Sequence, residues 1–220
     1  MNKPVIFFGV GDFAKMLYVQ SKDIKHLNVV AFMADDEYCL HTEFCGLPIW
    51  KSSTIDSKMV EQYDFLICVG YKKMRNRQII YDKLLKQGCQ FINFIHPTVT
   101  ILPEVQMGTN NIFLSNVTVE NNAQIGNNNI FWSQTIVGHN IWIGNHNFFA
   151  ANVTLAGNCV IGNLCFLGVS AFTLNGLTIE DETYLVAGSG LFTNTKKAAK
   201  YWGNPARSVE SHETTGIIIS

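Results

Sequence analysis

Residues 119–149 read VENNAQ-IGNNNI-FWSQTI-VGHNIW-IGNHNF-F, and the residue that opens each block of six is apolar. The same period runs from Ile95 to Leu191, where 16 of 17 opening positions are apolar and Thr173 is the exception. Asparagine, which tolerates the left-handed backbone of tight turns, recurs three residues after the opening position. The next position is mostly small or slender. This pattern predicts a coil of short strands that stack on one another.

The composition excludes several classes of protein. Of the 220 residues, 47% are hydrophobic and 15% are charged, which excludes a disordered chain. A net charge of −1 disfavours nucleic-acid binding. No apolar run is long enough to span a bilayer, so we expect no membrane partner. The first apolar run is short and resembles a strand rather than a signal peptide, and the six cysteines form no CxxC pair. We therefore expect reduced thiols and a cytoplasmic protein.

The basic residues are distributed unevenly along the chain. No Lys or Arg occurs between Lys86 and Lys196, and that stretch is rich in Asn and Gly. Such a shift in composition marks a domain boundary. We expect an α/β domain over residues 1–92, a coil domain over 93–195 and a tail over 196–220.

The first domain is expected to alternate strands and helices, which implies a small parallel sheet. The expected strands are residues 4–9, 28–33 and 63–70, and the expected helices are 12–22 and 74–86. Residues 9–14 match G-x-G-x-x-A between a strand and a helix, so Gly9, Gly11 and Asp12 are candidates to hold a phosphate. About 90 residues supply only one mononucleotide-binding half, which disfavours an NAD dehydrogenase and favours one nucleotide diphosphate. The alternative is a turn that merely starts a helix.

Two further groups follow predicted strands of this domain. Asp35 and Asp36 end the second strand and could bind a ribose or base, or they could belong to a solvated loop. Gly70, Lys72 and Arg75 follow the third strand, and the two cations could lie near a diphosphate at the same sheet edge. Their alternative is ordinary solvation at a helix start.

Six motifs spread over residues 3–209 resemble one known family. They are G-x-G-x-x-A at 9–14, V-G-x-x-x-x-R at 69–75, H-P at 96–97, I-V-G-H-N at 136–140, A-G-N-x-x-I-G at 156–162 and G-N-P-A at 203–206. The chain resembles the hexapeptide-repeat sugar acetyltransferases, which include sialic-acid O-acetyltransferases and bacillosamine-pathway N-acetyltransferases. The resemblance implies a half-Rossmann domain followed by a left-handed parallel β-helix. It also implies a homotrimer that uses acetyl-CoA.

The resemblance places the catalytic base at His139. The repeat supports this independently, because His139 falls at a corner of the coil, where side chains point outward. His146 also falls at a corner and is the rival. The family often has Asp or Glu after the base, whereas this chain has Asn140. The amide oxygen of Asn140 could still orient the ring, or Asn140 could be only a turn residue. Glu120, one coil earlier, could substitute for that carboxylate.

The remaining site residues concern the coenzyme. By resemblance, the Gly157 N–H would stabilise the oxyanion, and Val169 and Ala187 would contact pantetheine through their backbone. The coil contains no Lys or Arg, so the cluster of Lys196, Lys197, Lys200 and Arg207 beside Pro205 suits the coenzyme phosphates. A solvated tail is the alternative. No metal is expected.

The expected function is acetyl-CoA-dependent N-acetylation of a UDP- or dTDP-linked amino-deoxy sugar, in the synthesis of surface polysaccharide or glycan precursors. The alternative within this class is O-acetylation of sialic acid or a related sugar. A zinc carbonic anhydrase needs three converging histidines, which the coil does not offer. A non-enzymatic β-helical scaffold explains the repeats but not an outward histidine, a nucleotide-type turn and a basic cluster together.

Overall fold

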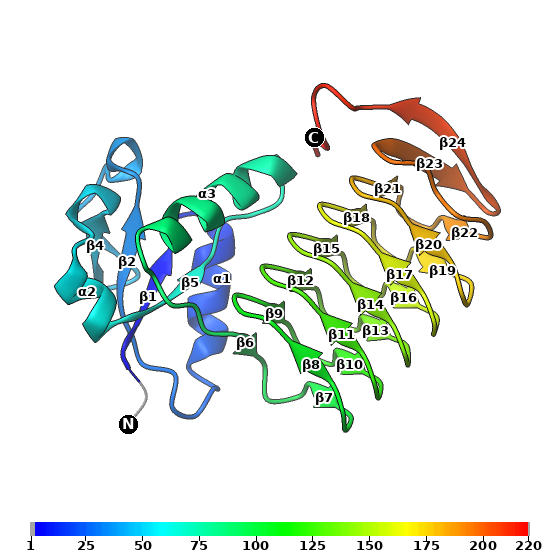
Figure 1. Ribbon diagram of the computed structural model, residues 1–220. Helices are drawn as coiled ribbons and strands as arrows, with labels where there is room; N and C mark the ends of the chain where they lie inside the picture. Colours follow the sequence, from blue (N-terminus) through cyan, green and yellow to red (C-terminus); the bar gives the residue numbers. More distant parts are fainter. Residues whose placement is uncertain (1–2, 220) are drawn as a thin grey trace.

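The computed structural model describes residues 3–219 and divides into an α/β domain and a coil of short strands (Figure 1). Residues 1–2 and 220, at the ends of the expected first domain and tail, lie outside that range. The expected fold class is confirmed. The chain forms a half-Rossmann domain followed by a left-handed parallel β-helix.

The α/β domain contains a five-stranded sheet in the order β3-β4-β2-β1-β5. Its parallel strands are β1 (Val5–Phe8), β2 (Val29–Ala34), β4 (Leu47–Lys51) and β5 (Asp64–Ile67), and β3 (Glu43–Phe44) runs antiparallel to β4. The helices are α1 (Asp12–Ser21), α2 (Ser57–Gln62) and α3 (Met74–Lys86), with 3₁₀ turns η1 (Asp36–Tyr38) and η2 (Ser52–Thr54). Sequence analysis missed β3, β4 and α2.

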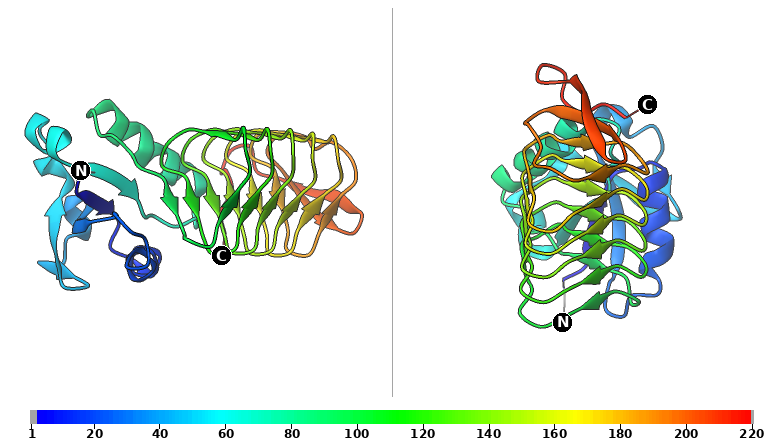
Figure 2. Two further views of the ribbon diagram at one scale, coloured as in Figure 1. Left: turned by 90° about the horizontal axis from the view of Figure 1, so that it is seen from below. Right: turned by 90° about the vertical axis from the view of Figure 1, so that its right-hand side faces the viewer.

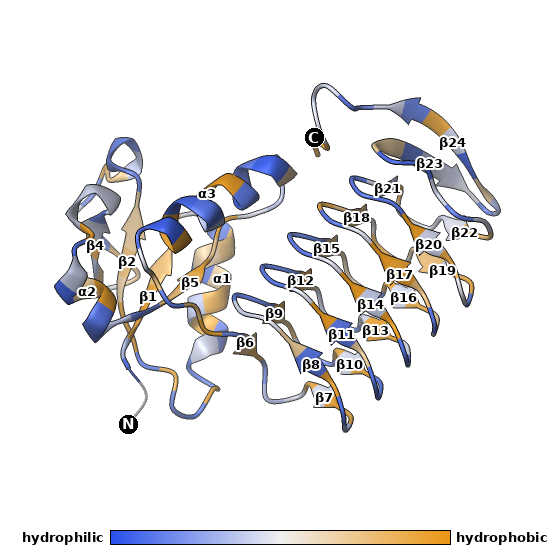
Figure 3. Ribbon diagram, viewed as in Figure 1, coloured by the Kyte–Doolittle hydropathy of each residue, from blue (hydrophilic) through white to orange (hydrophobic). Residues whose placement is uncertain are grey.

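Each miss has a physical reason. Every residue of β1 is buried, so its apolar run stands out in the sequence and is orange in Figure 3. In β4 no residue is fully buried, and Pro48 and Lys51 interrupt the apolar pattern. β3 and α2 are too short to show a period.

The coil has three faces, each a stack of two-residue parallel strands. The turns of the coil follow one another in a row (Figure 2, left). Face 1 contains β6 (Phe94–Ile95), β9 (Ile112–Phe113), β12 (Ile130–Phe131), β15 (Phe148–Phe149), β18 (Phe166–Leu167) and β21 (Tyr184–Leu185). Face 2 contains β7 (Thr100–Ile101), β10 (Thr118–Val119), β13 (Ile136–Val137), β16 (Thr154–Leu155), β19 (Phe172–Thr173) and β22 (Gly190–Leu191). Face 3 contains β8 (Gln106–Met107), β11 (Gln124–Ile125), β14 (Trp142–Ile143), β17 (Val160–Ile161) and β20 (Thr178–Ile179).

The six-residue period produces this coil for two reasons. The opening residues point inward, so that the rings of Phe113, Phe131 and Phe149 stack with centroids 4.6 and 4.9 Å apart. The recurrent asparagines occupy the turns, where Asn110, Asn116, Asn122, Asn128, Asn140, Asn152 and Asn158 have φ between 53° and 60°. Asparagine adopts this left-handed conformation more readily than most residues.

Polar and aromatic contacts join the two domains. The Ile67 N–H donates to Oδ1 of Asn110, 2.8 Å away. The buried side chain of Arg77 donates through Nε to the Asn128 carbonyl at 3.5 Å, and Nδ2 of Asn128 donates to the Arg77 carbonyl at 3.4 Å. Phe13, in the first turn of α1, stacks on Trp132 of the coil. The carboxyl ends of β1 and β5 are therefore held close to face 1.

The segment that we expected to be a tail has regular structure. β23 (Ala199–Gly203) pairs in parallel with β21 and antiparallel with β24 (Ala206–Ser211), so the hairpin extends face 1. Residues 212–219 then run back toward the α/β domain, where the Ile219 N–H donates to the Lys72 carbonyl at 2.9 Å (Figure 1). We call residues 212–219 the strap.

Candidate active site

His139 lies in the turn between β13 and β14, at the corner that joins faces 2 and 3. Its side chain is partly exposed, as expected for an outward corner position. Its backbone N–H donates to Oε2 of Glu120 at 2.9 Å. Glu120 therefore fixes the backbone of the histidine rather than its ring, which differs from the substitution considered from the sequence.

The Asn140 side chain contacts the imidazole. Its Nδ2 lies 3.0 Å from Nδ1 of His139, and its Oδ1 accepts from Nδ2 of Asn122 at 3.1 Å. For Nε2 of His139 to accept a proton, Nδ1 must carry the hydrogen and face an acceptor. Turning both amides by 180° presents Oδ1 of Asn140 to Nδ1 and keeps the bond between the two asparagines. Asn122 and Asn140 therefore form a pair whose orientation is linked to the imidazole tautomer.

Gly157 occupies the same corner one coil above His139. A Cβ built on Gly157 would lie 2.6 Å from Nε2 of the imidazole. Only glycine leaves room for the ring at this position. Within residues 3–219 the Gly157 N–H donates to no other atom, so it is available to a ligand beside Nε2.

His146, the rival base, is buried beneath α3. Its Nδ1 lies 2.8 Å from Nδ2 of Asn128, and its ring meets that of Tyr81 at a centroid distance of 5.5 Å. Burial lowers the pKa of His146 to about 4. A histidine enclosed in the joint between the two domains is poorly placed to meet a substrate.

A cavity of about 400 Å³ lies between face 1 and the loop that follows β5. Aromatic side chains form much of its lining: Tyr71, Trp132, Phe148, Phe166 and Tyr184. The rings of Phe148 and Phe166 are stacked 5.1 Å apart, and that of Tyr71 lies 4.3 Å from Phe148. Small residues at the corner between faces 1 and 2 complete the lining, and they include Val169 and Ala187. The two residues expected to contact pantetheine thus line this cavity.

The phosphate-binding candidates Gly9, Gly11 and Asp12 follow β1, and Gly70 follows the neighbouring β5. They lie at the same sheet edge as the cavity. Gly9 has a φ of 137°, and a Cβ there would lie 2.8 Å from the Cys68 carbonyl oxygen, so the turn requires glycine. Gly11 precedes the first turn of α1 and has open space around its Cα, as a phosphate site needs.

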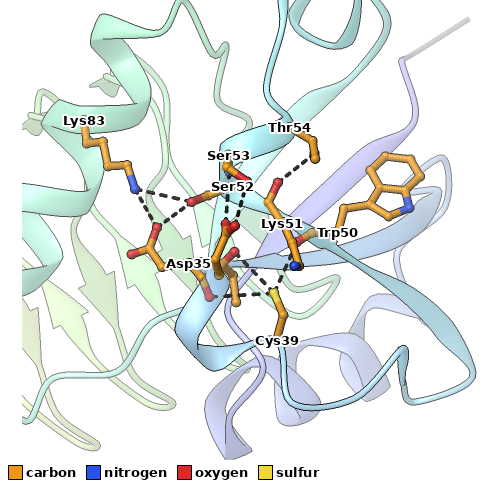
Figure 4. A network of polar contacts seen from close by, with 10 residues as sticks. Asp35, Cys39, Trp50, Lys51, Ser52, Ser53, Thr54 and Lys83 are labelled. Carbon is orange, nitrogen blue, oxygen red and sulfur yellow. Dashed lines mark hydrogen bonds and ion pairs between the residues drawn. The ribbon is translucent and has the colours of Figure 1, made fainter.

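Asp35 and Asp36 are held by partners that the sequence did not reveal (Figure 4). Asp35 accepts a hydrogen bond from Ser52 at 2.6 Å and pairs with Lys83, whereas Asp36 accepts from the Ser53 hydroxyl at 2.8 Å. Burial acts to raise the pKa of Asp35, but the bonds from Lys83 and Ser52 outweigh it and lower that pKa. Both aspartates line a separate shallow cavity of about 390 Å³. A ribose or base that bound the Asp35 carboxylate would have to share that carboxylate with Lys83.

Arg75 has a different partner from the one expected. Its Nε and Nη2 donate to the two carboxylate oxygens of Glu182 at 2.6 and 2.8 Å. A guanidinium used in this way has fewer donors left for a diphosphate, and the expected role of Arg75 stays a prediction. Lys72 remains exposed, and its carbonyl accepts from the strap.

The basic cluster lies beside the terminal hairpin. Lys196 and Lys197 are exposed, and Pro205 is exposed in the turn between β23 and β24. Lys200 pairs with Glu210 at 3.1 Å, which leaves Lys196 and Lys197 as better candidates for an anion.

Within residues 3–219, no three His, Cys, Asp or Glu side chains gather as a metal site. No helix in that range has the length and apolar character needed to cross a bilayer.

Residues 122–157 match the bacterial transferase hexapeptide (six repeats) family model. A comparison with curated protein sequences finds no match. Solved structures extend the likeness to nearly the whole chain.

One similar structure is PerB from Caulobacter crescentus, in complex with CoA and GDP-perosamine. The TM-score is 0.85 at 23% identity, over 96% of this chain and 99% of that one. The acetyltransferase domain of PglB from Neisseria gonorrhoeae, in complex with acetyl coenzyme A, gives 0.85 at 20% identity, over 95% and 100%. WeeI from Acinetobacter baumannii gives 0.83 at 21%, over 94% and 100%. The expected resemblance to sugar acetyltransferases is thus confirmed in the repeat and the fold.

Proposed function

We propose that the protein is an acetyl-CoA-dependent N-acetyltransferase that acts on the amino group of a nucleotide-linked amino-deoxy sugar. The observation that carries this proposal is the outward His139, with Asn140 on its Nδ1 and Gly157 beside its Nε2. PerB, which shares the fold, binds CoA and GDP-perosamine. The candidate acceptors therefore include GDP-linked as well as UDP- and dTDP-linked amino sugars.

The chemistry follows from that arrangement. The amine nitrogen attacks the thioester carbonyl while Nε2 of neutral His139 takes its proton, an effect typically worth about 10²–10⁴-fold in rate. The Gly157 N–H donates to the oxyanion of the tetrahedral intermediate. When the carbon–sulfur bond breaks, the imidazolium returns the proton to the departing CoA thiolate. The products are the N-acetylated sugar and CoA.

The remaining candidates are assigned to the two substrates. The nucleotide diphosphate would lie at the sheet edge formed by Gly9, Gly11, Asp12 and Gly70, with its sugar in the aromatic cavity. The pantetheine arm would pass Val169 and Ala187. The coenzyme phosphates would lie near Lys196, Lys197 and Pro205.

The His139 corner and the cavity belong to different edges of one prism. His139 lies where faces 2 and 3 meet, whereas Val169 and Ala187 lie where faces 1 and 2 meet. Face 2 between them exposes apolar side chains, and Ile136 is 41% exposed. We propose that a second copy packs here and brings its own His139 to this cavity, as in a homotrimer.

Activity on a panel of acceptors tests the proposal. The protein is mixed with acetyl-CoA and GDP-, UDP- or dTDP-linked amino sugars, and products are read by mass spectrometry. We expect acetylation of one acceptor and a loss of about 10²-fold or more in kcat for His139→Ala. Asn121→Ala is the matched control, because Asn121 occupies the same corner one coil earlier. Undiminished product from His139→Ala would overturn its role as base.

The same panel includes sialic acid as a hydroxyl acceptor. Product from sialic acid alone would replace N-acetylation by O-acetylation. If no product forms and acetyl-CoA shows no saturable binding, the proposed activity is wrong and the protein is a non-enzymatic β-helical scaffold.

A further inference from the structure

The strap connects the far end of the coil to the loop before α3, although these segments are well over 100 residues apart in sequence. The Ile219 N–H donates to the Lys72 carbonyl at 2.9 Å, and the Met74 N–H donates to the Ile217 carbonyl at 3.3 Å. Lys73 and Ile218 form an antiparallel bridge between these bonds. The strap thus adds a short strand to the loop that also carries Tyr71.

The N-terminal end of the strap is held by Arg75, which also forms the ion pair with Glu182. The guanidinium that pairs with Glu182 also donates to the carbonyls of Glu213 and Thr214, at 2.8 and 3.2 Å. Gly216 has a φ of 65°, and a Cβ there would lie 2.7 Å from Nε of Arg75. Arg75 therefore joins three segments, namely α3, the coil and the strap.

The three isoleucines of the strap face different surroundings. Ile217 is buried, and Ile218 is 56% exposed. Ile219 is partly buried and lines the aromatic cavity beside Tyr71. The only strap residue in the lining of that cavity, within residues 3–219, is Ile219.

We propose that the strap is a wall of the acceptor site and that Ile219 contacts the bound acceptor sugar. This inference rests on the proposed function, because it takes the aromatic cavity as the acceptor site. Ile219 is fixed through the loop that bears Tyr71, on the α/β side of the cavity, whereas Val169 and Ala187 lie on the coil side. The strap therefore acts on the acceptor and leaves the coenzyme site unchanged.

Ile219→Ser and Ile218→Ser form a matched pair, because the same change is made at neighbouring residues. Ile219 lines the cavity, whereas Ile218 is exposed to solvent. Binding of each nucleotide-linked amino sugar is measured by calorimetry without acetyl-CoA, and kinetics are measured with both substrates. We expect Ile219→Ser to raise the acceptor Kd and KM about 10-fold or more, with an unchanged KM for acetyl-CoA. Ile218→Ser should change neither. A chain ended after Gly216 should lose acceptor affinity at least as strongly.

The outcomes separate this inference from the proposed function. Acetylated product with equal acceptor KM in Ile219→Ser and the unaltered protein would overturn the inference alone. A change confined to the KM for acetyl-CoA would also overturn it, by assigning the residue to the coenzyme. Acceptor binding that Ile219→Ser weakens, without product, would overturn the proposed reaction and keep the strap as a wall of the binding site. Neither binding nor product would overturn both. Thermal unfolding of each variant tests whether the fold is retained.

Discussion

Gly157 lies directly against the imidazole of His139, one coil away along the same corner. A Cβ at Gly157 would come within 2.6–2.9 Å of Nε2, Cε1 and Cδ2 of that ring. The absence of a side chain at Gly157 therefore sets where the ring can lie. One position thus serves two purposes, since it admits the proposed base and presents an N–H beside it.

Gly157→Ala should displace the imidazole with little change in the fold, because the atoms that the new Cβ would meet belong to the partly exposed side chain of His139. We expect kcat to fall about 10²-fold, which is the lower range of the effect of a positioned base. The melting temperature and acetyl-CoA affinity should stay close to those of the unaltered protein. Asn121→Ala, at the same corner one coil before His139, is the control, because it changes an exposed side chain there without adding an atom beside the imidazole. Full activity in Gly157→Ala would contradict the close approach of ring and glycine.

Asn140 should control the tautomer of His139 rather than bind a substrate. We expect Asn140→Leu to lower kcat about 10-fold or more with unchanged KM values, because Nδ1–H then has no acceptor. Asn140→Asp should retain activity, and the pH below which kcat/KM falls should move upward, since a carboxylate favours the imidazolium. The measurement is kcat/KM against pH. Equal profiles for Asn140→Leu and the unaltered protein would remove Asn140 from the site.

His146 should make stability depend on pH. Its folded pKa of about 4 lies below the ordinary 6.5, so the unfolded chain binds more protons between these values. The stabilising effect is therefore present above pH 6.5 and is lost as pH falls toward 4, by about 3 kcal/mol in total. Urea unfolding at several pH values measures the loss. His146→Gln retains an amide that can meet Asn128, and its stability should fall less steeply over this range. Identical slopes would contradict the prediction.

The ion pair of Arg75 and Glu182 should be a structural latch. Glu182 has a buried side chain, so Arg75→Gln leaves a carboxylate without its main partner. We expect a loss of about 2 kcal/mol in the free energy of unfolding and faster proteolysis of the strap. In Arg75→Gln/Glu182→Gln the loss should be smaller than the sum of the single changes. A double-mutant cycle by urea unfolding gives the coupling energy, and a value near zero would contradict the latch.

The coil could be predicted from sequence because its signal is local and repeated. Each block of six contains one inward residue and one turn residue, as Ile125 and Asn128 illustrate. Thr173 breaks the apolar pattern at one position, and the blocks on either side keep the period. β4 could not be predicted, because its stability comes from pairing with β2 and β3 rather than from its own apolar residues.

The same distinction applies to the candidate site, where contacts within the repeat could be predicted and contacts between the domains could not. His139 and Gly157 are related by the 18-residue coil spacing, and Asn140 directly follows His139 in the chain, so their proximity follows from the repeat. The pairing of Arg75 with Glu182 joins segments 107 residues apart and depends on how two domains meet. The expectation that Arg75 binds a diphosphate did not foresee this pairing for that reason. The strap was equally hidden, because its contacts are mostly backbone bonds to Lys72 and Met74.

The strap also limits how long the coil can be. Repeat proteins with open ends tolerate added or deleted repeats, because each repeat contacts only its neighbours. Here one extra coil between β9 and β21 would move Glu182 away from Arg75 by about 4.8 Å, the spacing of neighbouring strands. The pair, which is 2.6 Å apart, would separate, and Ile219 would no longer reach Lys72. The strap thus acts as a gauge of coil number, and insertions or deletions of whole coils are excluded unless the strap changes length with them.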